Sequence, residues 1–76
     1  MTRKKPQEQR HDLITEAVTD MRMVASAAAS PRVVLSVAAL LEAAAYRVKS
    51  DQWRRDEIAV NALRAAATWL GEESPA

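Results

Sequence analysis

The sequence predicts an all-α protein, a three-helix bundle. Apolar residues recur at steps of three and four through three segments, which is the spacing of one helix face. Pro31 and Gly71 stand where one helix would have to start and the last would have to stop. Alanine is the strongest intrinsic helix former, and an alanine triplet lies in each segment, at 27–29, 43–45 and 65–67. The predicted helices span residues of about 7–29, 31–49 and 52–70.

The first predicted helix, 7–29, follows a flexible basic arm at 1–6, because Pro6 discourages a helix before it. Its inward stripe consists of Leu13, Ile14, Ala17, Val18, Met21, Val24, Ala25 and Ala28. Ser30 and Pro31 then end this helix and start the next, since proline cannot extend a helix but suits its first position.

The second predicted helix, 31–49, is apolar on two sides. The side expected in the core carries Val33, Val34, Val37, Leu41, Ala44, Ala45 and Val48. At about 100° per residue, the opposite side carries Leu35, Ala39, Ala43 and Tyr46. A helix with two apolar sides is expected to be covered on both.

The third predicted helix, 52–70, has either Ser50 or Asp51 as its cap and Gly71 as its left-handed end. Its polar residues form one narrow stripe: Arg54, Glu57, Asn61, Arg64 and Thr68. Apolar residues flank this stripe on both sides: Trp53, Val60 and Ala67, and Ile58, Ala62, Ala65 and Trp69. We expect one helical domain at 7–71 and a frayed acidic tail at 72–76.

The surplus of apolar surface predicts association. A single core in a chain of 76 residues rarely supplies more than roughly 3–5 kcal/mol, and the absence of cysteine excludes disulfides. We therefore expect a homodimer through the second and third helices, with truncation of Leu35 and Tyr46 to alanine weakening it. The residues expected at an oligomer or partner interface are Leu35, Ala39, Ala43, Tyr46, Trp53, Ile58, Val60 and Trp69.

Enzyme chemistry is not expected. His11 is the only histidine, so the sequence does not predict a nucleophile activated by a neighbouring base. Gly71 is the only glycine, so it does not predict a glycine-rich phosphate loop. The carboxylates of Asp12, Glu16 and Asp20 repeat at helical steps, which is typical of a solvated row. The sequence predicts no catalytic residue, cofactor, metal or small-molecule ligand. No apolar run reaches the roughly 20 residues that a bilayer requires, so a cytoplasmic location without membrane contact is expected.

The preferred function is a small protein-interaction module, an adaptor, inhibitor or accessory factor, that binds itself and a second protein. The alternative is a dimeric DNA-binding regulator, because basic residues gather in the arm and between the second and third helices. Its nucleic-acid contacts would be Arg3, Lys4, Lys5, Arg10, Arg47, Lys49, Arg54 and Arg55. A pI near 8.2 is below the range of dedicated nucleic-acid binders.

Overall fold

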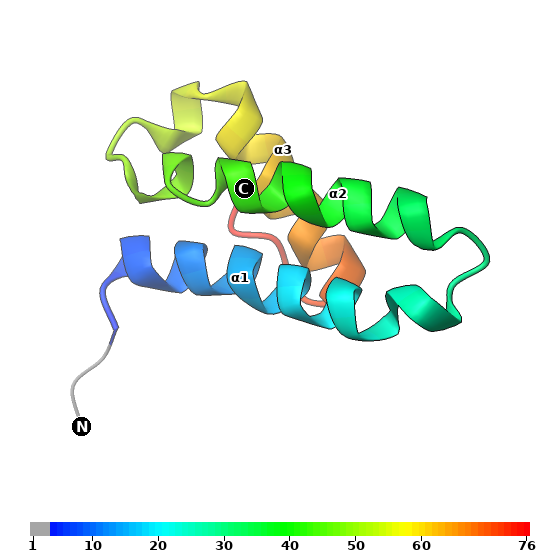
Figure 1. Ribbon diagram of the computed structural model, residues 1–76. Coiled ribbons are helices and arrows are strands. Elements are labelled where there is room, and N and C mark those ends of the chain that lie inside the picture. Colours follow the sequence, from blue (N-terminus) through cyan, green and yellow to red (C-terminus); the bar gives the residue numbers. More distant parts are fainter. Residues whose placement is uncertain (1–3) are drawn as a thin grey trace.

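The computed structural model describes residues 4–76 and confirms an all-α, three-helix fold. In Figure 1, α1 and α2 run side by side in opposite directions, and α3 crosses behind them. The molecule measures 36 × 31 × 18 Å, and a depth of 18 Å fits two layers of helices. The α-helices are α1 (Pro6–Val24), α2 (Pro31–Ala44) and α3 (Glu57–Leu70), and the short 3₁₀ helices are η1 (Ala25–Ala27), η2 (Arg47–Lys49) and η3 (Trp53–Arg55).

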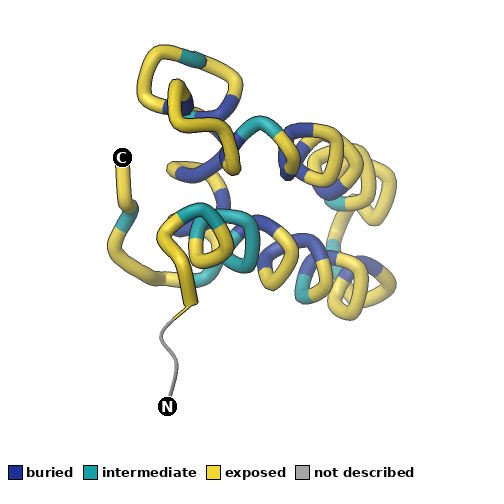
Figure 2. Tube along the Cα trace, turned by 90° about the vertical axis from the view of Figure 1, so that its left-hand side faces the viewer, coloured by how far each residue is buried: buried dark blue, intermediate teal, exposed yellow. Residues whose placement is uncertain are grey.

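The core lies where the three helices face one another (Figure 2). Alanines supply half of its buried residues, so the helix backbones approach closely and each contact buries little apolar area. Three large side chains are fully buried: Ile14, Val48 and Leu63. The expected inward stripe of the first helix is confirmed at Ile14, Ala17, Val18 and Met21, which are buried, and is wrong at Val24, which is 39% exposed at the end of α1.

The first helix is shorter than predicted. It ends at Val24, and the alanine triplet at 27–29 lies in η1 and the turn that follows. Ala28 is extended, with φ −75° and ψ 152°. The chain must reverse direction here to bring α2 alongside α1, and that geometric requirement overrides the helix propensity of alanine.

The segment between α2 and α3 also differs from the prediction. The second helix ends at Ala44 instead of residue 49, and the third begins at Glu57 instead of residue 52. Asp56 caps α3, whereas the Ser50 hydroxyl accepts the Gln52 N–H within the preceding turn (3.1 Å). The two intervening 3₁₀ turns, η2 and η3, place Val48 and Trp53 in the core.

The N-terminal half of α2 projects beyond α3 (Figure 1). Val33, which the sequence placed in the core, is therefore exposed. Val37, also expected in the core, is exposed because it faces the open space between α2 and α3, while Ala38, Leu41 and Ala44 are buried. Gly71 takes the expected left-handed conformation at the end of α3, with φ 69°. Among the described helices, none combines the length and apolar character needed to cross a membrane.

Candidate interaction surfaces

An open apolar groove of about 510 Å³ lies between α2 and α3. We call it the α2–α3 groove. Leu40 and Ile58 stand on its two sides and are 72% and 55% exposed. Glu57 is its one charged residue. Its lining comprises Val37, Leu40, Leu41 and Ala44 from α2 and Glu57, Ile58, Asn61, Ala62 and Ala65 from α3.

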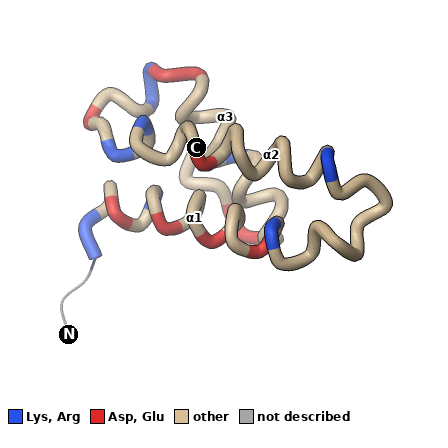
Figure 3. The backbone as a smooth tube through the Cα atoms, viewed as in Figure 1, with Lys and Arg blue, Asp and Glu red and all other residues tan. Residues whose placement is uncertain are grey.

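The groove follows from helical spacing and small side chains. Each wall repeats at steps of three and four, so its residues share one helix face. Ala44, Ala62 and Ala65 leave the space between the helices unfilled, since a methyl group occupies little volume. Charge is also scarce here, because Arg32 and Glu42 are the only charged residues of α2 (Figure 3). Glu42 pairs with Arg22 of α1, at 2.6 Å.

The residues predicted for an interface do not form one surface. Ile58, on α3, lies in the groove. The predicted residues on α2 and just after it are exposed but do not line the groove: Leu35, Ala39, Ala43 and Tyr46. Trp69 donates from its indole Nε1 to Asp20 Oδ2 (2.7 Å), which places it against α1. Val60 is half-buried against the core. Leu40 was missed, although it shares a helical face with Val37 and Ala44.

Trp53 does not lie on a partner surface, so this part of the interface prediction is wrong. Its side chain is only 4% exposed and belongs to the core cluster. The η3 turn directs the indole inward, where the guanidinium carbons of Arg10 and Arg54 lie 4.8 and 4.6 Å from a ring centroid. Arg10 Nε also donates to the Val48 carbonyl at 2.7 Å. Trp53 therefore joins α1, η2 and η3.

The predicted basic cluster is divided among several intramolecular contacts. Lys4 pairs with Asp12, and this contact raises the pKa of the lysine and lowers that of the aspartate. Arg10 and Arg54 stack on Trp53, and Arg47 pairs with Asp56. Lys5, Lys49 and Arg55 are exposed, and Arg3 lies outside the described residues.

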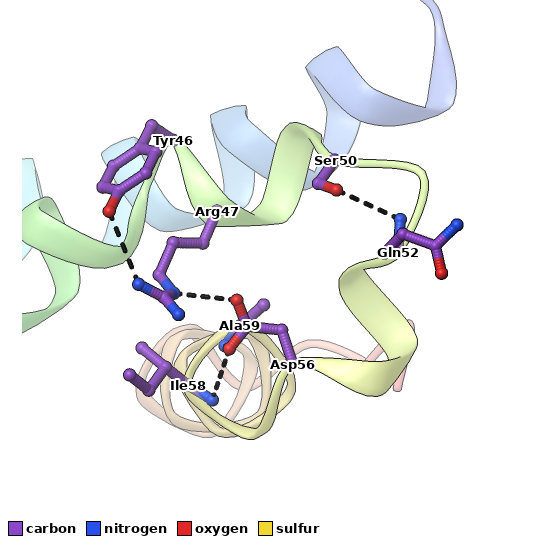
Figure 4. A network of polar contacts seen from close by, with 7 residues as sticks. All are labelled: Tyr46, Arg47, Ser50, Gln52, Asp56, Ile58 and Ala59. Carbon is purple, nitrogen blue, oxygen red and sulfur yellow. Dashed lines mark hydrogen bonds and ion pairs between the residues drawn. The ribbon is translucent and has the colours of Figure 1, made fainter.

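Asp56 is the polar centre of the segment between α2 and α3 (Figure 4). Its Oδ1 accepts the N–H groups of Ile58 (3.0 Å) and Ala59 (3.4 Å), while its Oδ2 accepts from Arg47 Nε (2.8 Å). The hydrogen bond from Arg47 is the main cause that holds the pKa of Asp56 below its ordinary value. One carboxylate thus caps α3 and ties it to η2.

Replacing Asp56 with alanine is expected to lower the melting temperature by about 4–8 °C, because both the cap and the ion pair are lost. Asp56→Asn keeps an acceptor for the cap and is expected to show a smaller loss. Asp51→Asn is the matched control, because Asp51 makes no cap. The ion pair's contribution is present above the ordinary carboxylate pKa of about 3.9 and declines as pH falls through the lowered native-state pKa. Thermal unfolding by circular dichroism at neutral and acid pH tests this, and equal melting temperatures for all three variants would contradict it.

The groups considered for chemistry are spread out. His11 Nδ1 lies 4.0 Å from Asp12 Oδ1 in the second turn of α1. Asp12 pairs with Lys4, and Asp20 with Trp69. Within residues 4–76, no three His, Cys, Asp or Glu side chains are grouped so as to hold a metal ion. Comparison of the chain with models of known protein families, with curated proteins and with solved structures found no match.

Proposed function

We propose that the chain is a non-enzymatic protein-interaction module, an adaptor, inhibitor or accessory factor, that forms a homodimer through the α2–α3 groove. The observation that carries this proposal is the groove itself, apolar along both walls and bordered by the exposed side chains of Leu40 and Ile58. Contiguous exposed apolar surface of this kind marks interaction sites in small proteins.

The accessible surface area of the chain is larger than that of a compact monomer, which supports an additional contact surface. The chain exposes 5475 Å², whereas a compact monomer of its mass, 8.4 kDa, exposes about 4600 Å². The extended ends contribute part of this excess.

A second copy is the occupant that fits this face best. A two-fold symmetric interface uses the same patch on both subunits, so a suitable patch needs a projection and a recess side by side. Leu40 projects at the edge of the groove, and Ala62 and Ala65 form the recess next to it. We propose that Leu40 of each subunit enters the groove of the other. The outer side of α2, with Leu35, Ala39 and Ala43, stays exposed in this dimer for a second protein.

The basic residues support a protein partner over DNA. Lys4 and Arg47 are neutralised by carboxylates within the chain. Nucleic-acid affinity depends on cations that are able to release counterions from phosphates. Intramolecular pairing reduces the number available for that role.

Leu40→Glu is expected to raise the dimer dissociation constant at least tenfold, because it places a charge where an apolar side chain would be buried. Sedimentation velocity over a concentration series measures this directly. Met23→Glu is the matched control, because Met23 is 75% exposed and does not line the groove.

Three results of this experiment contradict the proposal. The first is a wild-type chain that stays monomeric across the micromolar range, and the second is an equal effect of Met23→Glu. The third is a loss of association on truncating Leu35 and Tyr46 to alanine without an effect of Leu40→Glu, which would move the interface to the outer side of α2.

A further inference from the structure

A second pocket, of about 430 Å³, lies at the start of α1 and does not involve the α2–α3 groove. We call it the Trp53 pocket. It is bounded by the first turns of α1, by η3 and by the acidic segment at 72–76, which we call the tail. The residues that line it are Pro6, Gln9, Arg10, Leu13, Trp53, Arg54, Glu72, Glu73 and Pro75.

The side of the Trp53 pocket formed by α1 and η3 is cationic, and the side formed by the tail is acidic. The guanidinium groups of Arg10 and Arg54 both lie over Trp53, and within residues 4–76 neither has a carboxylate oxygen within 4.0 Å. Burial, followed by the charge of Arg54, lowers the pKa of Arg10. Arg10 Nε donates a hydrogen bond to the Val48 carbonyl at 2.7 Å. This bond holds the guanidinium group of Arg10 in place beside the pocket. A guanidinium fixed in this way is suited to bind a carboxylate through two parallel hydrogen bonds.

The tail brings carboxylates into the same pocket. Gly71, at φ 69°, turns the chain out of α3, and the Glu72 N–H donates to the Ala67 carbonyl (2.9 Å). Glu72, Glu73 and Pro75 then line the pocket, and Ser74 between them is half-buried. The tail forms one side of the pocket, next to the two guanidiniums, and makes no ion pair with either, so an added carboxylate is able to compete with it.

We infer that the Trp53 pocket is a recognition site for acidic peptide segments, and that the tail competes with them for its two guanidiniums. The inference does not depend on the proposed dimer. A peptide fits better than a nucleic acid, because Pro6, Leu13 and Pro75 add apolar walls and because an acidic segment of protein already forms one side of the pocket. A tethered segment acts at an effective concentration of about millimolar, so an acidic partner has to outcompete it.

The test uses the full chain and a peptide of the sequence Gly-Glu-Glu-Ser-Pro-Ala, blocked at both ends. Binding is followed by the indole N–H signal of Trp53 in NMR spectra, with Trp69→Phe used to assign the two tryptophan signals. In the double variant Glu72→Gln and Glu73→Gln the tail loses its charge, and the added peptide is expected to bind about three- to tenfold more tightly than it binds the unaltered chain. Glu16→Gln with Glu42→Gln changes the net charge equally outside both the Trp53 pocket and the α2–α3 groove and is expected to leave binding unchanged.

Two further variants identify the site. Arg54→Gln in the uncharged-tail background is expected to weaken peptide binding about tenfold, whereas Arg55→Gln, which does not line the pocket, is not. A peptide with glutamine in place of both glutamates is expected to shift the Trp53 signal only weakly. Equal binding of the two peptides, or equal effects of Arg54→Gln and Arg55→Gln, would overturn the inference. A short DNA duplex that shifts the signal at lower concentration than the peptide would reassign the pocket to phosphates and also overturn it.

Discussion

Replacing Leu63 with alanine is expected to lower the free energy of unfolding by about 2–5 kcal/mol. The side chain is 0% exposed and lies in the middle of α3. The core residues of α3 around it are Ala59, Ala62 and Ala66, whose methyl groups cannot swing into the space that the leucine would leave. A single core in a domain of 76 residues rarely supplies more than roughly 3–5 kcal/mol, so this one substitution removes most of the stability.

Urea denaturation followed by circular dichroism measures this loss. Leu40→Ala is the matched control, because it removes the same atoms from a side chain that is 72% exposed, and it is expected to change monomer stability by less than about 0.5 kcal/mol. Both variants are measured over a series of protein concentrations, since association adds to apparent stability. A loss for Leu63→Ala no larger than that for Leu40→Ala would contradict the packing described above.

Local signals in the sequence predicted the features that depend on local geometry. Pro31 starts α2, because the proline ring fixes φ near the helical value. Gly71 ends α3, because glycine has no side chain to oppose a positive φ. The inward face of α1 also follows its apolar stripe, since α1 packs against both other helices and has one clear buried side. The stretch from Ala45 to Asp56 depends instead on where Val48 and Trp53 must reach the core. Helical periodicity placed Val48 on the core side, which is correct, but placed Trp53 on a flank, because it does not show where the chain leaves the helix.

The candidate groove was predictable in kind but not in residues. The excess of apolar positions on the second and third helices indicated an additional contact surface. Which positions face it depends on the angle at which α3 crosses α2, and this is a property of the assembled fold. Ala67, expected on a flank, is 1% exposed, while Val33 and Val37, expected inside, are exposed. The Trp53 pocket was beyond the sequence pattern for the same reason, because Arg10 and Arg54 lie far apart along the chain.

Replacing Trp53 with alanine is expected to lower the free energy of unfolding by about 3–5 kcal/mol, the cost of a large aromatic cavity. Trp53 fills the joint between α1 and η3 and is 4% exposed. The substitution also removes the ring on which Arg10 stacks. The Arg10 side chain is then less restrained, and its hydrogen bond from Nε to the Val48 carbonyl is expected to weaken. Trp53→Phe keeps an apolar ring at this joint and is expected to retain more than half of the stability that alanine loses.

Trp69→Ala is the comparison that separates this core role from the removal of any tryptophan. Trp69 is 39% exposed and has one hydrogen bond, to Asp20, so its truncation is expected to have the smaller effect. Urea denaturation of the three variants gives the order directly. Removing an indole that faces solvent leaves no cavity. If Trp69→Ala destabilised the chain more than Trp53→Ala, Trp53 would therefore not be a core residue, and the prediction that it contacts a partner would stand again.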